Sequence, residues 1–382
     1  MRIAQVAPLY ESVPPKRYGG TERVVSYITE ELVNLGHDVT LFASGDSVTR
    51  ARLISPCEQS LRTDELSVDP LAPHVTMLNQ VFRTATKYDI IHFHIDYLHF
   101  PASVRANIPN VTTLHGRLDI PELRPLYREY SSMRVISISD AQRQPLPWLN
   151  WQCTVHHGLP RDLYNFTRET DGYLAFLGRI SPEKGVDRAI EIATLAGIRL
   201  KIAAKVDPVD QDYFNQRIKP LLDDPLVDFI GEVGEPEKKD LLGKALALLL
   251  PVDWPEPFGL VMIEAMAFGT PTIAFNRGAV AEIIDDGVSG FVCDGVEDAV
   301  SAVARIGTVS RKRCRQAFEE RFTVTRMVGD YVDLYQRVVG ESFCEGQRVS
   351  EPSVRPVLPS ELSSPSNAVE STTPRRGLRG SQ

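Results

Sequence analysis

Two glutamates, Glu256 and Glu264, are separated by seven residues in the run EPFGLVMIE, which leads from a proline-rich turn into a helix-like apolar stretch. The start of that helix, residues 259–261, would present unpaired backbone N–H groups that attract an anion. Glu264 interrupts an apolar run, where an unpaired charge is costly. We therefore predict that both carboxylates border a ligand with hydroxyl groups. The alternative is a structural helix residue and a solvated turn residue, as most glutamates are.

Two cations lie in the segment LGRISPEKG, which follows a strand predicted at residues 173–177. Arg179 and Lys184 would lie beside the N-terminus of the next helix, a combination that suits a diphosphate. Such cations stabilise the charge that grows on a departing phosphate. The alternative is an exposed pair that forms surface salt bridges.

Further candidates follow strands predicted at residues 3–8 and 111–114. Gly19 and Gly20 would let backbone N–H groups approach a phosphate, although a tight turn without a ligand explains them equally well. His115 would reach the same edge of the sheet, but a histidine in this position is more often structural. Lys16 and Arg17 are candidates to contact a ligand.

These segments together resemble glycosyltransferase family 4, a family with the GT-B fold. The spacing of Glu256 and Glu264 and the flanking letters PFGL, EAMA and GTP carry the resemblance, which covers residues 1–340. Residues 10–25 and 92–101 look most similar to a bacterial branch that includes an avilamycin-pathway glycosyltransferase.

The resemblance implies transfer of a hexosyl group from a nucleotide diphosphate sugar to an acceptor hydroxyl, with retention of configuration and without a metal or other cofactor. His115 would contact the donor sugar, Glu256 would hold its hydroxyls, and Glu264 would orient the ribose. The residues implied to be catalytic are Arg179, Lys184, Glu256 and His115, and those implied to bind the donor are Gly19, Gly20, Phe258, Gly259, Leu260, Val261 and Glu264. The acceptor stays open between a saccharide, a lipid and a small metabolite.

Two groups of residues could suggest a metal site. His92 and His94 would share one face of a strand, with Asp96 and His99 nearby. No HExxH-type pattern or second cluster supports a metal, so we expect core or acceptor-side roles. Residues 210–212 spell Asp-Gln-Asp, which we interpret as an acidic helix start far from the other motifs. We therefore predict no metal site.

Other activities on a similar architecture stay open, because a fold does not determine a function. A nucleotide-sugar epimerase or a phosphorylase could use the same domains, and a non-enzymic module could bind a sugar between them. The paired cations favour a transferase over the binding module. A dehydrogenase is disfavoured because Gly19-Gly20-Thr21 lacks the GxGxxG pattern.

The elements that must position these residues alternate between strands and helices. A strand at residues 3–8, a helix at 21–35 and a strand at 38–43 form a first βαβ unit, with Thr21 as the helix N-cap and Gly36 in a left-handed conformation at its end. Further strands are predicted at residues 90–94, 111–114, 135–139, 173–177, 200–204, 227–230, 247–251, 272–275 and 290–293, and helices at 186–196 and 260–268. This alternation predicts an α/β protein, and with the resemblance a GT-B architecture of two doubly wound Rossmann-like domains facing a central cleft.

The domain boundaries follow from the same pattern. We place an acceptor-side domain at residues 1–165 and a nucleotide-sugar-binding domain at 166–321. An amphipathic helix at 322–340 would pack back on the first domain. Residues 341–382 are rich in Ser, Pro, Glu and Arg and are predicted to be a disordered tail.

Composition limits the partners. The chain has 382 residues and a formal net charge of -8, which disfavours binding to nucleic acid or anionic lipid. No apolar run approaches the roughly 20 residues of a membrane-spanning helix. Five scattered cysteines suggest neither disulfides nor a zinc site. The first residues lack the pattern of a secretion signal, so we expect a cytoplasmic protein.

Overall fold

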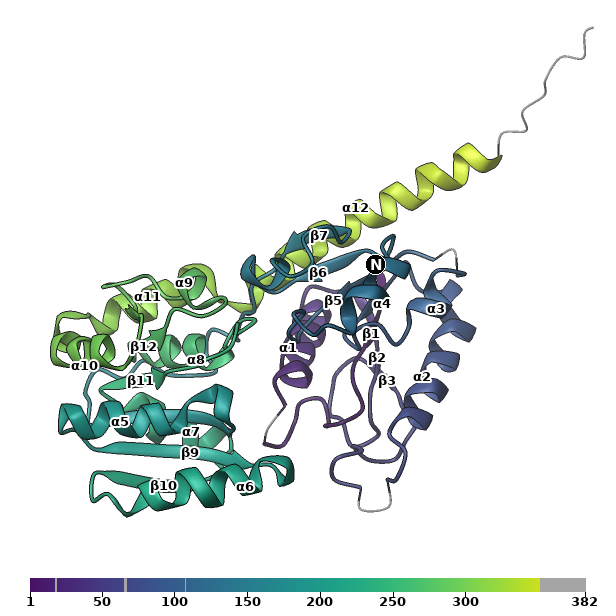
Figure 1. The fold of residues 1–382 in the computed structure, drawn as a ribbon. Coiled ribbons are helices and arrows are strands. Elements are labelled where there is room, and N and C mark those ends of the chain that lie inside the picture. The colour runs from purple at the N-terminus through teal and green to yellow at the C-terminus, as the bar shows by residue number, and fades with distance from the viewer. Residues whose placement is uncertain (18, 65–66, 107, 351–382) are drawn as a thin grey trace, which may run out of the picture. The chain divides into compact units, whose positions relative to one another are not determined.

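The computed structural model describes residues 1–17, 19–64, 67–106 and 108–350, which form two sheets with helices packed around them (Figure 1). The strand order is β3-β2-β1-β4-β5-β6-β7 in the first sheet and β10-β9-β8-β11-β12-β13 in the second. All pairings in both sheets are parallel. The predicted α/β class with two doubly wound sheets is confirmed.

The first domain carries the first sheet. Its elements are β1 (Arg2–Val6), α1 (Gly20–Asn34), β2 (Asp38–Phe42), β3 (Arg52–Ile54), α2 (Leu71–Thr84), β4 (Ile90–Phe93), α3 (Phe100–Ser103), β5 (Asn110–Thr113), α4 (Leu123–Glu129), β6 (Val135–Ser137) and β7 (Trp151–Thr154).

The second domain carries the second sheet. Its elements are β8 (Leu174–Ile180), α5 (Val186–Ala196), β9 (Leu200–Val206), α6 (Gln211–Tyr213), β10 (Val227–Gly231), α7 (Glu235–Gly243), β11 (Ala247–Leu250), α8 (Leu260–Phe268), β12 (Thr272–Phe275), α9 (Val280–Ile283), β13 (Gly290–Cys293), α10 (Val296–Arg305) and α11 (Arg311–Arg321). The helix α12 (Val324–Ser350) follows them.

The central strands are apolar because helices cover both faces of a parallel sheet. All residues of β4 and β12 are buried. The sequence did not predict β3 or β7, which form the two edges of the first sheet. Both are short and have no fully buried residue, so neither has the apolar run that reveals a central strand.

In each sheet, strands that follow one another in sequence are first added on one side of a starting strand and then on its other side. The strand β1 lies between β2 and β4, and β8 lies between β9 and β11. In doubly wound sheets, ligands bind in the crevice outside the carboxyl ends of the strands at such a reversal. The topology therefore places one crevice beyond β1 and β4 and another beyond β8 and β11.

The start of α1 differs from the prediction that Thr21 is its N-cap. The helix begins at Gly20, with Gly19 as N-cap at a φ of 146°, and Arg23 N–H donates to the Gly19 carbonyl at 3.2 Å. The prediction was wrong because a glycine reaches this φ without a side-chain clash and so starts the helix two residues early. The left-handed conformation expected at Gly36 is confirmed by its φ of 81°.

The helix α12 completes the core of the first domain. Its residues Tyr331, Leu334 and Tyr335 belong to the same buried cluster as Ile3 of β1 and Val24 of α1, and the first turns of α12 lie beside β6 and β7 in Figure 1. The sequence predicted a disordered tail from residue 341 onward. In the structure, residues 341–350 are instead helical and form the end of α12. The first helix-breaking residue is Pro352, so these ten residues can extend the preceding hydrogen-bonded turns. Residues 351–382 lie outside the described part of the chain.

A helix that spans a bilayer must be about 20 residues long and predominantly apolar. Among the residues that the structure describes, no helix meets both requirements for spanning a membrane.

Truncating a core residue of α12 should destabilise the protein. Leu334 is 3% exposed, so Leu334→Ala should lower the free energy of unfolding by about 2–5 kcal/mol by leaving a cavity. Urea unfolding followed by circular dichroism measures the change. Gln336→Ala, on the exposed side of the same helix, is the control. Equal midpoints for the two variants would show that α12 is not part of this core.

Candidate active site

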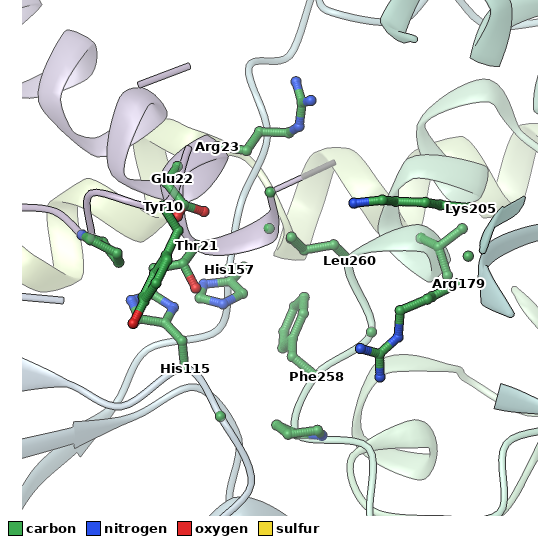
Figure 2. A pocket seen from close by; sticks show the side chains of 18 of the residues that line it. Tyr10, Thr21, Glu22, Arg23, His115, His157, Arg179, Lys205, Phe258 and Leu260 are labelled. Carbon is green, nitrogen blue, oxygen red and sulfur yellow. The ribbon is translucent and has the colours of Figure 1, made fainter. Parts of the chain in front are cut away.

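One cavity of about 740 Å³ lies at the carboxyl ends of both sheets. Figure 2 shows Tyr10, Glu22 and His115 of the first domain on one side, Arg179 and Lys205 of the second domain on the other, and Phe258 and Leu260 between them. The residues implied to be catalytic or donor-binding all line this cavity: Gly19, Gly20, His115, Arg179, Lys184, Glu256, Phe258, Gly259, Leu260, Val261 and Glu264. The structure therefore brings these residues together. Of the two further candidates, Arg17 also lines the cavity, whereas Lys16 is not among the lining residues and its ammonium lies 3.8 Å from Asp46.

Two helix N-termini border the cavity. The N-caps of α1 and α8 are Gly19 and Gly259, and a glycine has no side chain to hydrogen-bond the first N–H groups of its helix. Gly259 has a φ of 79°, and a side-chain carbon added at Gly20 would lie 3.5 Å from Leu260. The two helix starts thus face each other with their backbone N–H groups open to an anionic ligand.

Lys184 and Glu256 form a direct ion pair. The Lys184 ammonium lies 2.6 Å from the Glu256 carboxylate, which also accepts a hydrogen bond from the Trp254 indole at 3.0 Å. The ammonium lies 4.6 Å from the centre of the Trp254 ring, a cation–π distance. The glutamate is 7% exposed, so water screens the pair weakly. These contacts fix both side chains at the start of α8.

Arg179 is surrounded by carboxylates. It is the penultimate residue of β8, rather than following that strand as predicted. Its guanidinium is 2.8 Å from Glu183, 3.6 Å from Asp207 and 4.0 Å from Asp210. The prediction that the Asp-Gln-Asp run lies far from the other motifs was wrong. The parallel register that pairs Arg179 with Lys205 of β9 brings the loop after β9, with Asp210, beside Arg179.

Glu264 belongs to a chain of charges that joins the two domains. Its carboxylate lies 2.7 Å from the Lys238 ammonium, which is also 2.7 Å from Glu235 of α7. Glu235 in turn lies 3.1 Å from the guanidinium of Arg23 on α1. Glu264 is 4% exposed, and this pairing explains how a carboxylate is kept within an apolar helix.

Phe258 has a different environment from the other residues of its turn. It lines the cavity but is 2% exposed, and its ring packs edge-on against His157 at 4.8 Å and against Phe322 at 6.2 Å. The ring forms a rigid wall below the start of α8.

The buried His92 and His99 each hydrogen-bond to protein groups through both ring nitrogens. His92 contacts the hydroxyls of Tyr335 at 2.6 Å and Thr113 at 2.7 Å, and His99 contacts those of Ser103 at 2.7 Å and Thr112 at 2.8 Å. Among the described residues, no group of three or more His, Cys, Asp or Glu side chains is arranged to hold a metal ion.

The proton on the His115 ring is fixed by the hydrogen bonds behind it. The carbonyl oxygen of the Gln5 side chain accepts from His94 Nε2 at 2.8 Å, and its amide donates to the Tyr335 hydroxyl at 3.1 Å. A neutral imidazole carries one N–H, so His94 Nδ1 accepts from His115 Nε2–H across 2.9 Å. Nδ1 of His115 is then an acceptor. Burial lowers the pKa of His115 to about 3, so the ring is neutral near pH 7.

The sequence did not single out several residues that line the cavity. Lys205 and Lys238 add cations, Trp254 lies beside the ion pair, and His157 stacks on His115 with ring centres 5.4 Å apart. Trp254 precedes Glu256 by only two positions and could have been included on that ground. The other three lie in ordinary helices, strands or loops without a distinctive pattern.

Two sequence families match the chain. The family described as Glycosyl transferases group 1 matches residues 165–321, and Glycosyltransferase Family 4 matches residues 18–150. Among the relatives, a glycogen synthase from Mycobacterium tuberculosis is 26% identical over 375 residues, which cover 83% of this chain and 89% of that protein.

Solved glycosyltransferase structures share the fold. AviGT4, a glycosyltransferase involved in avilamycin A biosynthesis, matches with a TM-score of 0.67 and 24% identity, over 89% of this chain and 98% of that one. Anabaena Alr3699/HepE in complex with UDP and glucose matches with a TM-score of 0.69 and 18% identity, over 88% of this chain and 100% of that one. These likenesses establish the GT-B fold.

The state of the His115 ring can be measured directly. In protein with ¹⁵N-labelled histidine, the His115 signals, assigned by their loss in His115→Gln, should show the Nε2–H tautomer and no titration between about pH 5 and 8. Gln5→Leu removes the acceptor of His94 and should produce a mixture of His115 tautomers. The exposed Gln144→Leu is the control and should leave the spectrum unchanged. An Nδ1–H tautomer in the unmodified protein would contradict the assignment.

Proposed function

Because this chain belongs to the GT-B glycosyltransferases of family 4, we propose that it transfers a hexosyl group from a nucleotide diphosphate sugar to an acceptor hydroxyl, with retention of configuration and without a metal ion. The observation that carries the proposal is the grouping of Arg179, Lys184 and the starts of α1 and α8 around one cavity with Glu256 and Glu264. Cations and helix starts suit a diphosphate, and the carboxylates suit hydroxyl groups.

The diphosphate would bind between Arg179, Lys184 and the N–H groups at the start of α8. Both cations are paired with carboxylates, at 2.8 Å for Arg179 and 2.6 Å for Lys184, so the phosphates exchange one anionic partner for another. Charge that develops on the leaving phosphate is then stabilised by groups already in place. Such preorganised stabilisation is usually the largest single contribution to catalysis.

The chemical step balances without another reactant. The bond between the anomeric carbon and the diphosphate oxygen breaks, and its electron pair stays on the diphosphate. The acceptor oxygen forms the new bond on the same face of the sugar, and its proton passes to a phosphate oxygen. This route leads to retention and requires no side chain to act as a base.

The remaining residues would orient the donor. Glu264 accepts hydrogen bonds from ribose hydroxyls, and Glu256 from the hydroxyls of the transferred sugar. The neutral His115 ring offers its Nδ1 as a further acceptor for a sugar hydroxyl. Since His115 does not titrate near neutral pH, its role is to position the sugar and not to transfer a proton.

The proposal is tested by incubating the protein with UDP-, GDP-, ADP- and TDP-sugars, each with and without a panel of saccharide, lipid and small-metabolite acceptors. At least one should release its nucleoside diphosphate, and NMR of the glycoside should show the anomeric configuration of the donor. Glu256→Gln should lower turnover by about 10²-fold while donor affinity changes less, because the lost contacts tighten in the transition state. The exposed Glu129→Gln is the control.

Three results would contradict this proposal. An inverted product would exclude the same-face mechanism. Full activity of Glu256→Gln with a verified acceptor would remove Glu256 from the site. Absence of nucleoside diphosphate release with every donor would exclude the transferase.

Metal removal provides a separate prediction. Arg179, Lys184 and the helix starts supply the positive potential that a divalent cation provides in other enzymes, so activity should persist after dialysis against EDTA. The rate of nucleoside diphosphate release before and after dialysis measures this. Complete loss that magnesium or manganese restores would show that a metal takes part.

A further inference from the structure

The cavity extends over first-domain residues that have no role in the proposed donor site. Tyr10 follows β1, Tyr97 follows β4, Glu22 lies in the first turn of α1, and Arg62 and His74 also line the cavity. We call these five residues the first-domain surface. They surround the space where an acceptor must approach a donor held by the second domain.

The two tyrosines present aromatic area to the cavity on rigid supports. Tyr10 is 38% exposed and Tyr97 36% exposed. The Tyr10 ring lies 5.2 Å from the ring of His74, which is 1% exposed and anchored by the Pro70 carbonyl at 2.6 Å and the Leu9 N–H at 3.2 Å. Half-exposed tyrosines in a cavity wall suit a ligand with both an apolar face and polar edges.

Tyr97 is supported in a similar way. Its ring meets Tyr127 edge-on, with centres 6.4 Å apart and an interplanar angle of 88°, and Tyr127 is 1% exposed. A sugar ring has the required character, because its C–H groups form an apolar face while its hydroxyls point outward. The exposed parts of the two tyrosine rings can pack on that face.

Glu22 provides a polar group deep in the same wall. It is 6% exposed, and burial raises the pKa of its carboxyl to about 7. Near neutral pH the group can therefore accept or donate a hydrogen bond, and both suit a hydroxyl. A phosphate or carboxylate bound here would lie against the Glu22 carboxyl, in surroundings where burial already disfavours negative charge.

The charges around the first-domain surface are balanced. Three first-domain arginines line the described cavity, and each has a carboxylate nearby: Arg62 with Glu11 at 2.9 Å, Arg23 with Glu235 at 3.1 Å and Arg17 with Glu232 at 3.6 Å. Glu22 and Asp96 add further carboxyl groups. Carboxyl groups outnumber the arginines at this surface, so its net potential does not favour an anionic ligand.

We propose that the first-domain surface binds an uncharged saccharide acceptor, with a sugar ring against Tyr10 and Tyr97 and a hydroxyl hydrogen-bonded to Glu22. This inference rests on the proposed glycosyl transfer and narrows its acceptor. It separates a neutral saccharide from the phosphorylated sugars, uronic acids and phospholipids that the same fold could also accept.

The test measures acceptor-stimulated release of nucleoside diphosphate at a saturating concentration of the active donor. Neutral mono- and oligosaccharides are compared with their phosphorylated and uronic acid counterparts. Neutral acceptors should raise the rate above donor hydrolysis alone, and each charged counterpart should raise it less. Greater stimulation by a charged counterpart, or none by any neutral saccharide, would overturn the inference. No donor cleavage at all would instead contradict the glycosyl transfer, so the two failures are distinguishable.

Variants test the assigned surface. Tyr10→Ala and Tyr97→Ala should each raise the KM for the acceptor by about tenfold and the KM for the donor by less. Glu22→Gln should raise the acceptor KM by a smaller factor, because an amide keeps part of the hydrogen bonding. Trp148→Ala removes an aromatic residue of similar exposure, 37%, outside the cavity and is the control. Acceptor KM values that match the control would show that the saccharide binds elsewhere.

Discussion

The parallel direction of the strands is the constraint on which the cavity depends. Since all strands of a parallel sheet end at the same edge, loops that are far apart in the sequence must emerge together. The reversals beside β1 and β8 open a crevice at that edge in each domain. His115, Arg179 and Glu256 come from three different loops or strand ends, yet they line one cavity for this reason. The fold brings these loops together, and a few side chains on them determine the chemistry of the cavity.

Charge pairing is the second constraint. The cavity holds Lys184 against Glu256 at 2.6 Å and Lys238 against Glu264 at 2.7 Å, and both glutamates are less than a tenth exposed. Burying either member alone would be costly, so each member of a pair holds the other in position. A bound diphosphate sugar would then enter a site whose charges are already ordered, and little reorganisation would remain for the reaction itself.

The sequence allowed most strands and helices to be located, but not the contacts between residues that are distant in sequence. Apolar runs located the central strands, and the turn before Leu260 located α8, because both depend on local chemistry. The proximity of Arg179 and Asp210 depends on the register between β8 and β9, which no local pattern contains. The proton position on His115 depends on Gln5, which lies in an ordinary buried strand. Residues that act through a distant partner were therefore missed, whereas the residues predicted to be catalytic or donor-binding line one cavity.

The helix α12 shows that the first domain is not one continuous stretch of sequence. It follows the second domain in sequence, but Tyr331 and Tyr335 lie in the core of the first. Tyr335 also accepts from Gln5, whose carbonyl fixes His94 and through it His115. Residues 1–165 alone would lack this cover and the hydroxyl behind the histidines. The first domain's contribution to the cavity therefore depends on a segment that the chain reaches only after completing the second domain.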